Sequence, residues 1–161
     1  MNLELRDLFD ADQNDRRTAP SPDIIERDRR RRARTLQIIA AEKDLTAEDC
    51  LHAAFIFQHG DQSDDYWRSH ELAKRAVSLG HPEERKARWM VAASYDRWLT
   101  SQGKPQKYGT QFWGDQNGWR LLDYDPATTD EERAEWGVPP IAEALRRVEE
   151  LNRRGPSIPS S

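Results

Sequence analysis

A histidine near the end of a predicted helix is the first residue of this sequence that could do chemistry. His59 lies on one helical stripe with Phe55 and Ile56, which places its ring beside large apolar groups at the edge of the core. Burial lowers the pKa of a histidine and a nearby carboxylate raises it, so a histidine in such a place can act as an acid or a base near neutral pH. The alternative is that His59 only caps its helix, because a cation is favourable at a helix C-terminus.

An aspartate and an arginine stand next to each other in a later helical segment. Asp96 shares a face with Trp89 and Ala93, so its carboxylate lies among apolar or small residues and needs a partner. The neighbouring Arg97 points about 100° away around the helix, so the two side chains cannot pair with each other. We expect either a structural ion pair for each residue or a functional role, in which Asp96 orients a histidine and Arg97 binds an anion.

A neutral polar loop follows this segment. Residues 103–111 combine two glutamines, a tyrosine and a threonine around Gly109. Such side chains donate and accept hydrogen bonds without carrying charge, and a loop held by rigid elements can use them to fix a polar ligand. The same groups could equally satisfy the free backbone groups at the ends of the neighbouring helices.

Brought together, these segments would form a polar cleft with one base, one carboxylate and one fixed cation. The predicted catalytic residues are His59 and Asp96, and the predicted substrate-binding residues are Gln58, Arg97, Gln106, Tyr108, Thr110 and Gln111. We therefore expect a small enzyme of the hydrolase, lyase or isomerase type, with His59 as general acid/base and a small polar or anionic substrate. The alternative is a non-catalytic helical module that binds a peptide or a partner protein in this cleft or in the groove of a helical hairpin.

The three motifs resemble those of a bacterial domain family of unknown function, marked by Gln-His, Asp-Arg and Gln-x-Tyr-Gly-Thr-Gln. The resemblance covers roughly residues 30–152 and extends to Arg133, Gly137 and Pro140. Members of that family often have Gly-Trp-Pro before the helix that ends in Gln-His, where this chain has Asp44-Leu45-Thr46. The resemblance implies that the motif residues belong to one group, and it implies no particular reaction.

The composition bounds the classes of function. The chain has 161 residues, a net charge of −4 and no long apolar run, which indicates one domain and argues against nucleic-acid and membrane binding. Its one cysteine, Cys50, cannot form an intramolecular disulfide, and its four histidines lack the spacing of a metal site, so we expect no metal and no other cofactor. The N-terminus has no apolar signal region, which indicates a cytoplasmic protein. The sequence leaves the oligomeric state open.

Capping residues and apolar periodicity predict a mainly α-helical fold. Thr46 and Thr129 each stand three residues before an acidic residue, which is typical of a helix N-terminus. Gly80 and Gly103 stand where helices should end. The expected helices cover about residues 22–42, 46–59, 63–79, 82–102 and 129–136, followed by an amphipathic helix after Pro140. We therefore expect a bundle of five or six helices.

Two hairpins are expected in this bundle. The helices over residues 63–79 and 82–102 resemble a helical hairpin of the tetratricopeptide or Sel1-like kind, although the chain carries no second copy of it. Asn117-Gly118 stands between two runs that favour strands, and this dipeptide is a strong hairpin signal because both turn positions take positive φ. We expect this small β-hairpin near residues 110–124.

The two ends of the chain show little apolar periodicity. Residues 1–21 are expected to form a partly disordered arm that is ordered only where it docks, and residues 154–161 a disordered tail. Residues 22–153 then form a single helical domain. Within its first helix, the basic run Arg29–Arg34 is expected to be a solvated face.

The six tryptophans fall into two groups. Four lie in predicted helices and are expected to anchor helix packing, namely Trp67, Trp89, Trp98 and Trp136. Trp113 and Trp119 flank the hairpin turn, and one of them is expected to wall the candidate cleft.

Overall fold

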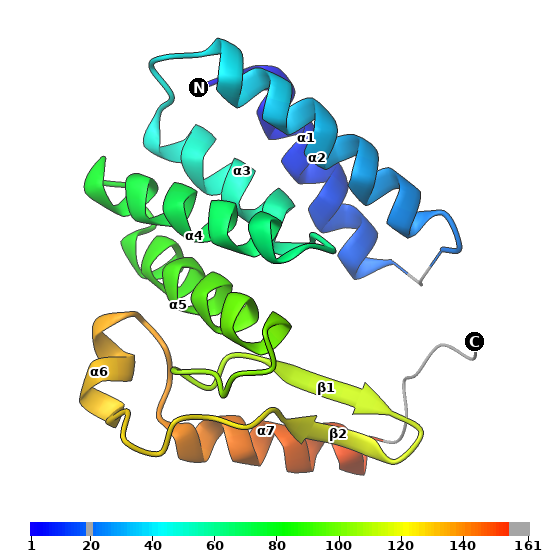
Figure 1. Cartoon of the computed structure of the whole chain (residues 1–161), viewed down its shortest axis with the longest axis vertical. Coiled ribbons are helices and arrows are strands. Elements are labelled where there is room, and N and C mark those ends of the chain that lie inside the picture. Colours follow the sequence, from blue (N-terminus) through cyan, green and yellow to red (C-terminus); the bar gives the residue numbers. More distant parts are fainter. Residues whose placement is uncertain (19–20, 155–161) are drawn as a thin grey trace.

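The computed structural model describes residues 1–18 and 21–154 of the chain (Figure 1). In these ranges the chain forms seven helices and one antiparallel pair of strands. The elements are α1 (Leu3–Arg17), α2 (Ile24–Ala41), α3 (Ala47–Gln58), α4 (Ser63–Ser78), α5 (Glu84–Ser101), β1 (Phe112–Asp115), β2 (Gly118–Leu121), α6 (Asp130–Glu135) and α7 (Ile141–Arg153). The mainly helical fold with a small β-hairpin is thus confirmed, and the tetratricopeptide or Sel1-like character of the α4–α5 pair stays a prediction. No helix of the described ranges is long and apolar enough to cross a membrane.

The first five helices build the hydrophobic core. Helices α1 and α2 lie side by side and both contact α3, while α4 lies between α3 and α5 (Figure 1). Leu51 and Phe57 of α3 are buried in this core. Ala73 and Ala76 of α4 and Ala87 of α5 have no exposed surface, because small side chains at these positions let the helices approach closely.

Two predicted helix starts are confirmed as capping boxes. The hydroxyl of Thr46 accepts a hydrogen bond from the backbone N–H of Asp49, whose carboxylate accepts one from the backbone N–H of Thr46. Thr129 and Glu132 form the same pair at the start of α6. Each box satisfies two backbone donors that the first helical turn leaves free, and both contacts span only three residues.

Helix α1 takes the place of most of the arm that the sequence predicts over residues 1–21. The side chain of Asn2 caps its first turn by accepting a hydrogen bond of 2.9 Å from the backbone N–H of Leu5. Leu5 is fully buried in the core, and Phe9 stacks on His52 of α3 with the ring centroids 4.3 Å apart. Leu3–Arg17 is thus ordered where it docks, as the sequence analysis expects of a docked arm, because packing on α3 supplies the apolar burial that the segment lacks by itself.

The β-hairpin forms where the sequence predicts it, but its turn differs. The strand register pairs Asp115 with Gly118, so the two turn residues are Gln116 and Asn117 and not Asn117 and Gly118. No residue other than glycine has positive φ in the described ranges, and Gly118 itself has a φ of 107°. One glycine directly after the turn thus supplies the left-handed conformation that we assigned to both turn residues.

A contact from the last helix explains why glycine stands at this position. A Cβ on Gly118 would lie 2.7 Å from the side-chain oxygen of Asn152. That oxygen accepts a hydrogen bond of 2.7 Å from the backbone N–H of Trp119, and the amide of Asn152 donates one of 2.9 Å to the carbonyl of Trp119. Asn152 therefore joins α7 to β2 by two hydrogen bonds.

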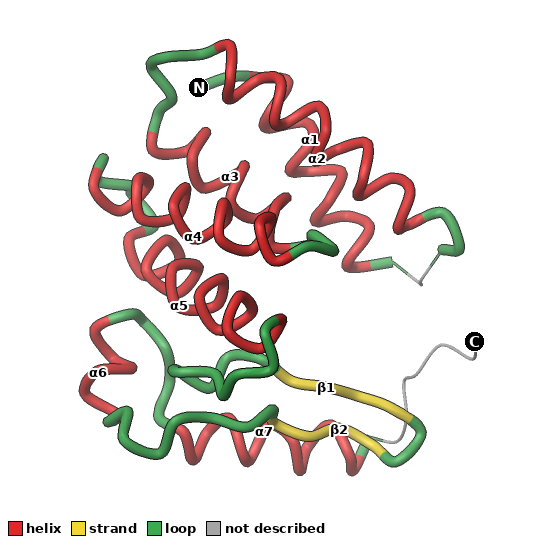
Figure 2. The backbone as a smooth tube through the Cα atoms, in the orientation of Figure 1, coloured by secondary structure: helices red, strands yellow, loops and turns green. Residues whose placement is uncertain are grey.

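The loops on either side of the hairpin are also joined. Figure 2 shows the loop after α5 and the loop after β2 running alongside each other, and Gln106 and Tyr124 form an isolated parallel bridge between them. Helices α6 and α7 follow, and α7 contacts β2. The end of the predicted disordered tail, residues 155–161, lies outside the described residues.

Candidate functional site

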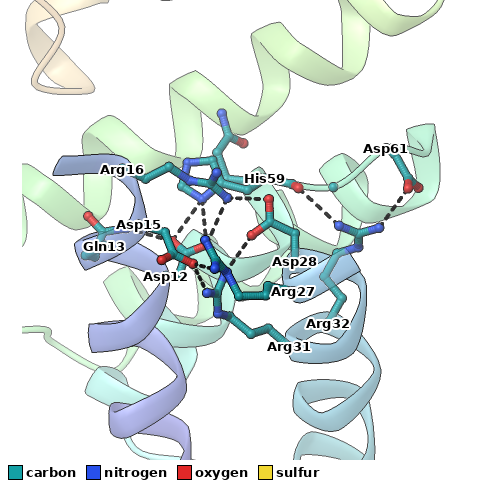
Figure 3. A network of polar contacts seen from close by, with 12 residues as sticks. Asp12, Gln13, Asp15, Arg16, Arg27, Asp28, Arg31, Arg32, His59 and Asp61 are labelled. Carbon is teal, nitrogen blue, oxygen red and sulfur yellow. Dashed lines mark hydrogen bonds and ion pairs between the residues drawn. The ribbon is translucent and has the colours of Figure 1, made fainter. Parts of the chain in front are cut away.

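His59 faces a carboxylate of the first helix. Its Nδ1 lies 2.9 Å and 3.1 Å from the two carboxylate oxygens of Asp12 (Figure 3). A carboxylate only accepts hydrogen bonds, so Nδ1 carries the proton of this contact. The sequence assigns the role of orienting partner to Asp96, and that assignment is wrong because the partner comes from α1.

The carboxylate of Asp12 belongs to a wider network of ion pairs. Arg16 pairs with Asp12 at 3.2 Å and with Asp28 of α2 at 2.6 Å, and the amide of Gln13 donates a hydrogen bond of 2.9 Å to Asp12. Figure 3 shows these side chains turned toward one another between α1, α2 and the end of α3. Burial acts to raise the pKa of Asp12, but the hydrogen bond and charge of His59, together with the charge of Arg16, hold that pKa below its ordinary value.

Two arginines of the basic run in α2 are buried, which corrects the prediction of a solvated face for Arg29–Arg34. The guanidinium group of Arg31 pairs with Asp15 of α1 and, at 2.7 Å, with Asp28. That of Arg32 pairs with Asp61 at 3.0 Å. Asp28 lies on α2 itself, whereas Asp15 of α1 and Asp61 after α3 come from elsewhere in the chain, so the spacing of charges within the run does not reveal these two partners.

Asp96 of α5 binds the backbone of the polar loop, residues 103–111. Its carboxylate is fully buried and accepts hydrogen bonds from the backbone N–H groups of Lys107 (2.8 Å), Tyr108 (2.9 Å) and Thr110 (3.0 Å). It also accepts one of 2.7 Å from the hydroxyl of Thr110. Burial raises the pKa of Asp96 above its ordinary value, and these four hydrogen bonds to the charged form oppose that shift. Both carboxylate oxygens therefore hold the loop backbone.

Gln106 and Tyr108 are likewise engaged within the protein. The fully buried amide of Gln106 donates to the carbonyl groups of Gln111 and Leu122 and accepts from the backbone N–H of Gln111, at 2.8 to 3.0 Å. The carbonyl of Tyr108 accepts a hydrogen bond of 3.0 Å from Arg133. Burial, with the charge of Asp96, raises the pKa of the Tyr108 hydroxyl to about 12.

Arg97 is a half-buried cation without a carboxylate partner among the described residues. Its guanidinium group donates to the carbonyl of Gln58 at 2.6 Å and to the side-chain oxygen of Gln111 at 2.8 Å. Its Nη2 has no hydrogen-bond partner there and is not among the buried atoms that lack one, so it reaches the surface. Burial lowers the pKa of Arg97, the nearby Tyr66 opposes this shift and the charge of Arg16 adds to it.

The end of α3 brings the two predicted dipeptides into one region. The carbonyl of Gln58 accepts from Arg97 of α5, and the carbonyl of His59 accepts from Arg32 of α2 at 3.1 Å. Two cations thus satisfy carbonyl groups at the negative end of the helix. Gln58, His59, Arg97 and Gln111 gather here, whereas the side chains of Asp96, Gln106 and Thr110 serve the loop.

His59 presents its second ring nitrogen to solvent. The side chain is 24% exposed, and Nε2 has no partner in the described ranges and is not a buried unpartnered atom.

A cleft of about 650 Å³ lies away from His59, along α7, and Thr110 is the one predicted site residue among those that line it. Trp89 lines this cleft, and neither Trp113 nor Trp119 does.

Residues of α1 and α4 were missed by the sequence reasoning. Asp12 of α1 binds His59, and Arg16 of α1 pairs with Asp12. The ring of Tyr66 of α4 lies 5.9 Å from the guanidinium carbon of Arg97. One signal for Asp12 exists, since it continues the helical spacing of Leu5 and Phe9. A carboxylate on that stripe indicates a buried partner, but the spacing does not identify it.

Neither a metal-binding cluster of the described residues nor a comparison with other proteins assigns a role to these residues. The described ranges contain no group of three or more histidine, cysteine or acidic side chains that could hold a metal ion. Neither the protein-family models nor the curated proteins nor the solved structures with which the chain was compared match it.

Proposed function

We propose that the protein is a small acid–base enzyme in which Nε2 of His59 exchanges a proton with an anionic substrate. The observation that carries the proposal is the division of the imidazole, with Nδ1 bound to the buried Asp12 and Nε2 at the surface. A carboxylate on one ring nitrogen fixes the tautomer and the ring orientation and leaves the lone pair of the other nitrogen free to accept a proton.

An anionic substrate fits the cations around this histidine. Arg16 shares Asp12 with His59, and Arg97 binds the carbonyl of the residue that precedes His59. A desolvated guanidinium group without a counter-ion is unfavourable, and an anion bound to Nη2 of Arg97 relieves that cost. The substrate then lies between Arg97 and His59. Asp12 positions the ring of His59 and does not touch the substrate.

The proton transfer has the same form in each reaction type. Nε2 takes a proton from a water molecule or from a carbon next to the anionic group, and returns it to the leaving group or to a second carbon. This covers hydrolysis, elimination and isomerisation. Asp96 and Gln106 act as positioning residues, because they hold the loop that carries Gln111 against Arg97. The three motifs then cooperate, two of them supplying His59 and Arg97 at the end of α3 and the third supplying the loop that carries Gln111.

A non-catalytic binding module is the second candidate, and an exposed aromatic patch favours it. Trp67 of α4 is 40% exposed, and it packs on Trp98 of α5 as a helix-packing residue at the surface and not in the core. Its ring lies 4.8 Å from that of Trp98 and 5.1 Å from that of His70, and Tyr95 stacks on Trp98 at 5.6 Å. Surface aromatic side chains on the α4–α5 pair can anchor a bound peptide.

Substitution of His59 separates the two candidates. Wild type, His59→Gln and His70→Gln are assayed on a panel of small anionic esters, hydroxy acids and keto acids, by product analysis. The enzyme proposal expects turnover by wild type and His70→Gln, and a loss of about 10²-fold to 10⁴-fold in His59→Gln. Circular dichroism and thermal unfolding establish that each variant is folded. The proposal is wrong if the wild type turns over no member of the panel, or if folded His59→Gln is as active as the wild type.

A further inference from the structure

A cleft along the last helix has an apolar lining that no part of the described chain fills. It has a volume of about 650 Å³, within the range of small-molecule sites, and lies between α5, α7 and the loop before β1. Its apolar surface comes from Trp89, Phe112, Val138 and Leu151. The loop is pressed against the start of α7, since a Cβ on Gly109 would lie 2.7 Å from the side chain of Ile141.

Helix α7 leaves its apolar stripe incompletely covered. No residue of this 13-residue helix is buried, although Ile141, Ala144, Val148 and Leu151 recur at helical spacing. Ala144 and Leu151 line the cleft directly. An amphipathic helix of a folded domain ordinarily buries such a stripe, so this cleft retains apolar area that a ligand can remove from water.

Three arginines at the edge of the cleft have no acidic partner. Arg146, Arg147 and Arg154 line it together with Glu143 and Glu150, yet none of the three forms an ion pair within 4.0 Å in the described ranges. The guanidinium carbon of Arg147 instead lies 5.9 Å from the centre of the Phe112 ring. An exposed cation thus stands beside an apolar wall of the cleft.

We propose that this cleft binds a small amphiphilic carboxylate, with its apolar body against Trp89, Phe112 and Val138 and its carboxylate on Arg147. The apolar lining gains from burial of an acyl or aryl body, and Arg147 can bind a carboxylate through two parallel N–H groups. This ligand site is separate from His59, which is not among the residues that line the cleft.

The test uses the indole N–H signals of the tryptophans in two-dimensional NMR, with decanoate below its micelle-forming concentration as the probe. A Trp89→Phe variant identifies the signal of Trp89. Decanoate is expected to shift that signal saturably, and decan-1-ol, which has the same chain without the charge, to bind about tenfold more weakly. The proposal fails if the acid and the alcohol bind equally, or if all indole signals shift alike without saturation.

Two arginine variants of α7 locate the carboxylate. Arg147→Gln is expected to weaken decanoate binding about tenfold, because it removes the charged donor beside Phe112. Arg153→Gln is the matched control, since Arg153 is exposed on the same helix and does not line the cleft. Equal effects of the two variants overturn the proposal. His59→Gln should bind decanoate like the wild type, so the result does not depend on the proposed enzyme activity.

Discussion

The carboxylate of Asp12 lies 2.9 Å from Nδ1 of His59, although 47 residues separate the two in the chain. Asp12 is 1% exposed and also binds Arg16, so α1 is held to the end of α3 by a buried cluster of charges. The first helix therefore does two things at once. It closes the hydrophobic core and it orients the histidine that we propose as acid/base.

Removal of the charge of Asp12 tests this double role. Asp12→Asn keeps the shape of the side chain but leaves Arg16 and His59 with a weaker partner, and we expect a loss of about 2 kcal/mol in the free energy of unfolding. Urea unfolding followed by circular dichroism measures it. Asp7→Asn on the exposed side of α1 is the control and should leave stability unchanged. Equal stabilities of both variants and the wild type would contradict a buried role for Asp12.

The buried ring of His52 makes stability depend on pH. Burial lowers the pKa of His52 below its ordinary value of 6.5, despite the opposing charge of Glu48, and its Nδ1 is buried without a partner. Between pH 6.5 and the lower folded-state pKa, the unfolded chain binds a proton that the folded chain does not. Stability should therefore be full above pH 6.5 and fall as the pH is lowered through this window.

Urea unfolding of the wild type and His52→Gln at several values between pH 5 and pH 8 measures the contribution of this one side chain. The variant should lose part of the pH dependence, while that of His70, whose pKa burial also lowers, remains in both proteins. Identical slopes against pH in the two proteins would show that His52 does not cause the effect.

The carboxylate of Asp96 should be the most sensitive single group of the polar loop. In Asp96→Asn an amide N–H group replaces one of the acceptors that bind Lys107, Tyr108 and Thr110, so a buried donor then faces backbone donors. We expect a loss of about 3 kcal/mol in the free energy of unfolding and faster amide hydrogen exchange in the loop. Asp123→Asn, at an exposed position after β2, is the control. Unchanged exchange in the loop of Asp96→Asn would contradict the assignment.

Inorganic phosphate tests the anion site at Arg97 without knowledge of the substrate. An anion that binds only the folded protein raises the free energy of unfolding, by about 1.4 kcal/mol at ten times the dissociation constant, and so raises the melting temperature. We expect phosphate to stabilise the wild type and to stabilise Arg97→Lys less, because the compact ammonium group of lysine lacks the planar fork with which Arg97 binds Gln58 and Gln111 and also presents Nη2. Sodium chloride at equal ionic strength controls for screening. Equal stabilisation of the two proteins by phosphate would place the anion elsewhere.

Much of the local structure follows from the sequence alone. The capping boxes at Thr46 and Thr129, the glycine that follows α4 and the helical periodicities all depend on contacts within about four residues, so the residue types determine them. The same holds for the presence of the β-hairpin. Its turn was predicted wrongly, since the register places Gly118 in β2, where Asn152 from a helix far along the chain contacts it.

The candidate site was predictable only in part. The sequence identified His59 and Arg97 by residue type, and the structure gathers both at the end of α3. It could not identify Asp12 as the partner of His59, nor the burial of Arg31 in α2. Charged side chains choose their partners across helix interfaces, and which faces meet is decided by the packing of the whole core. The sequence by itself thus determined the helices and their ends, whereas the tertiary structure decided which charges are buried together.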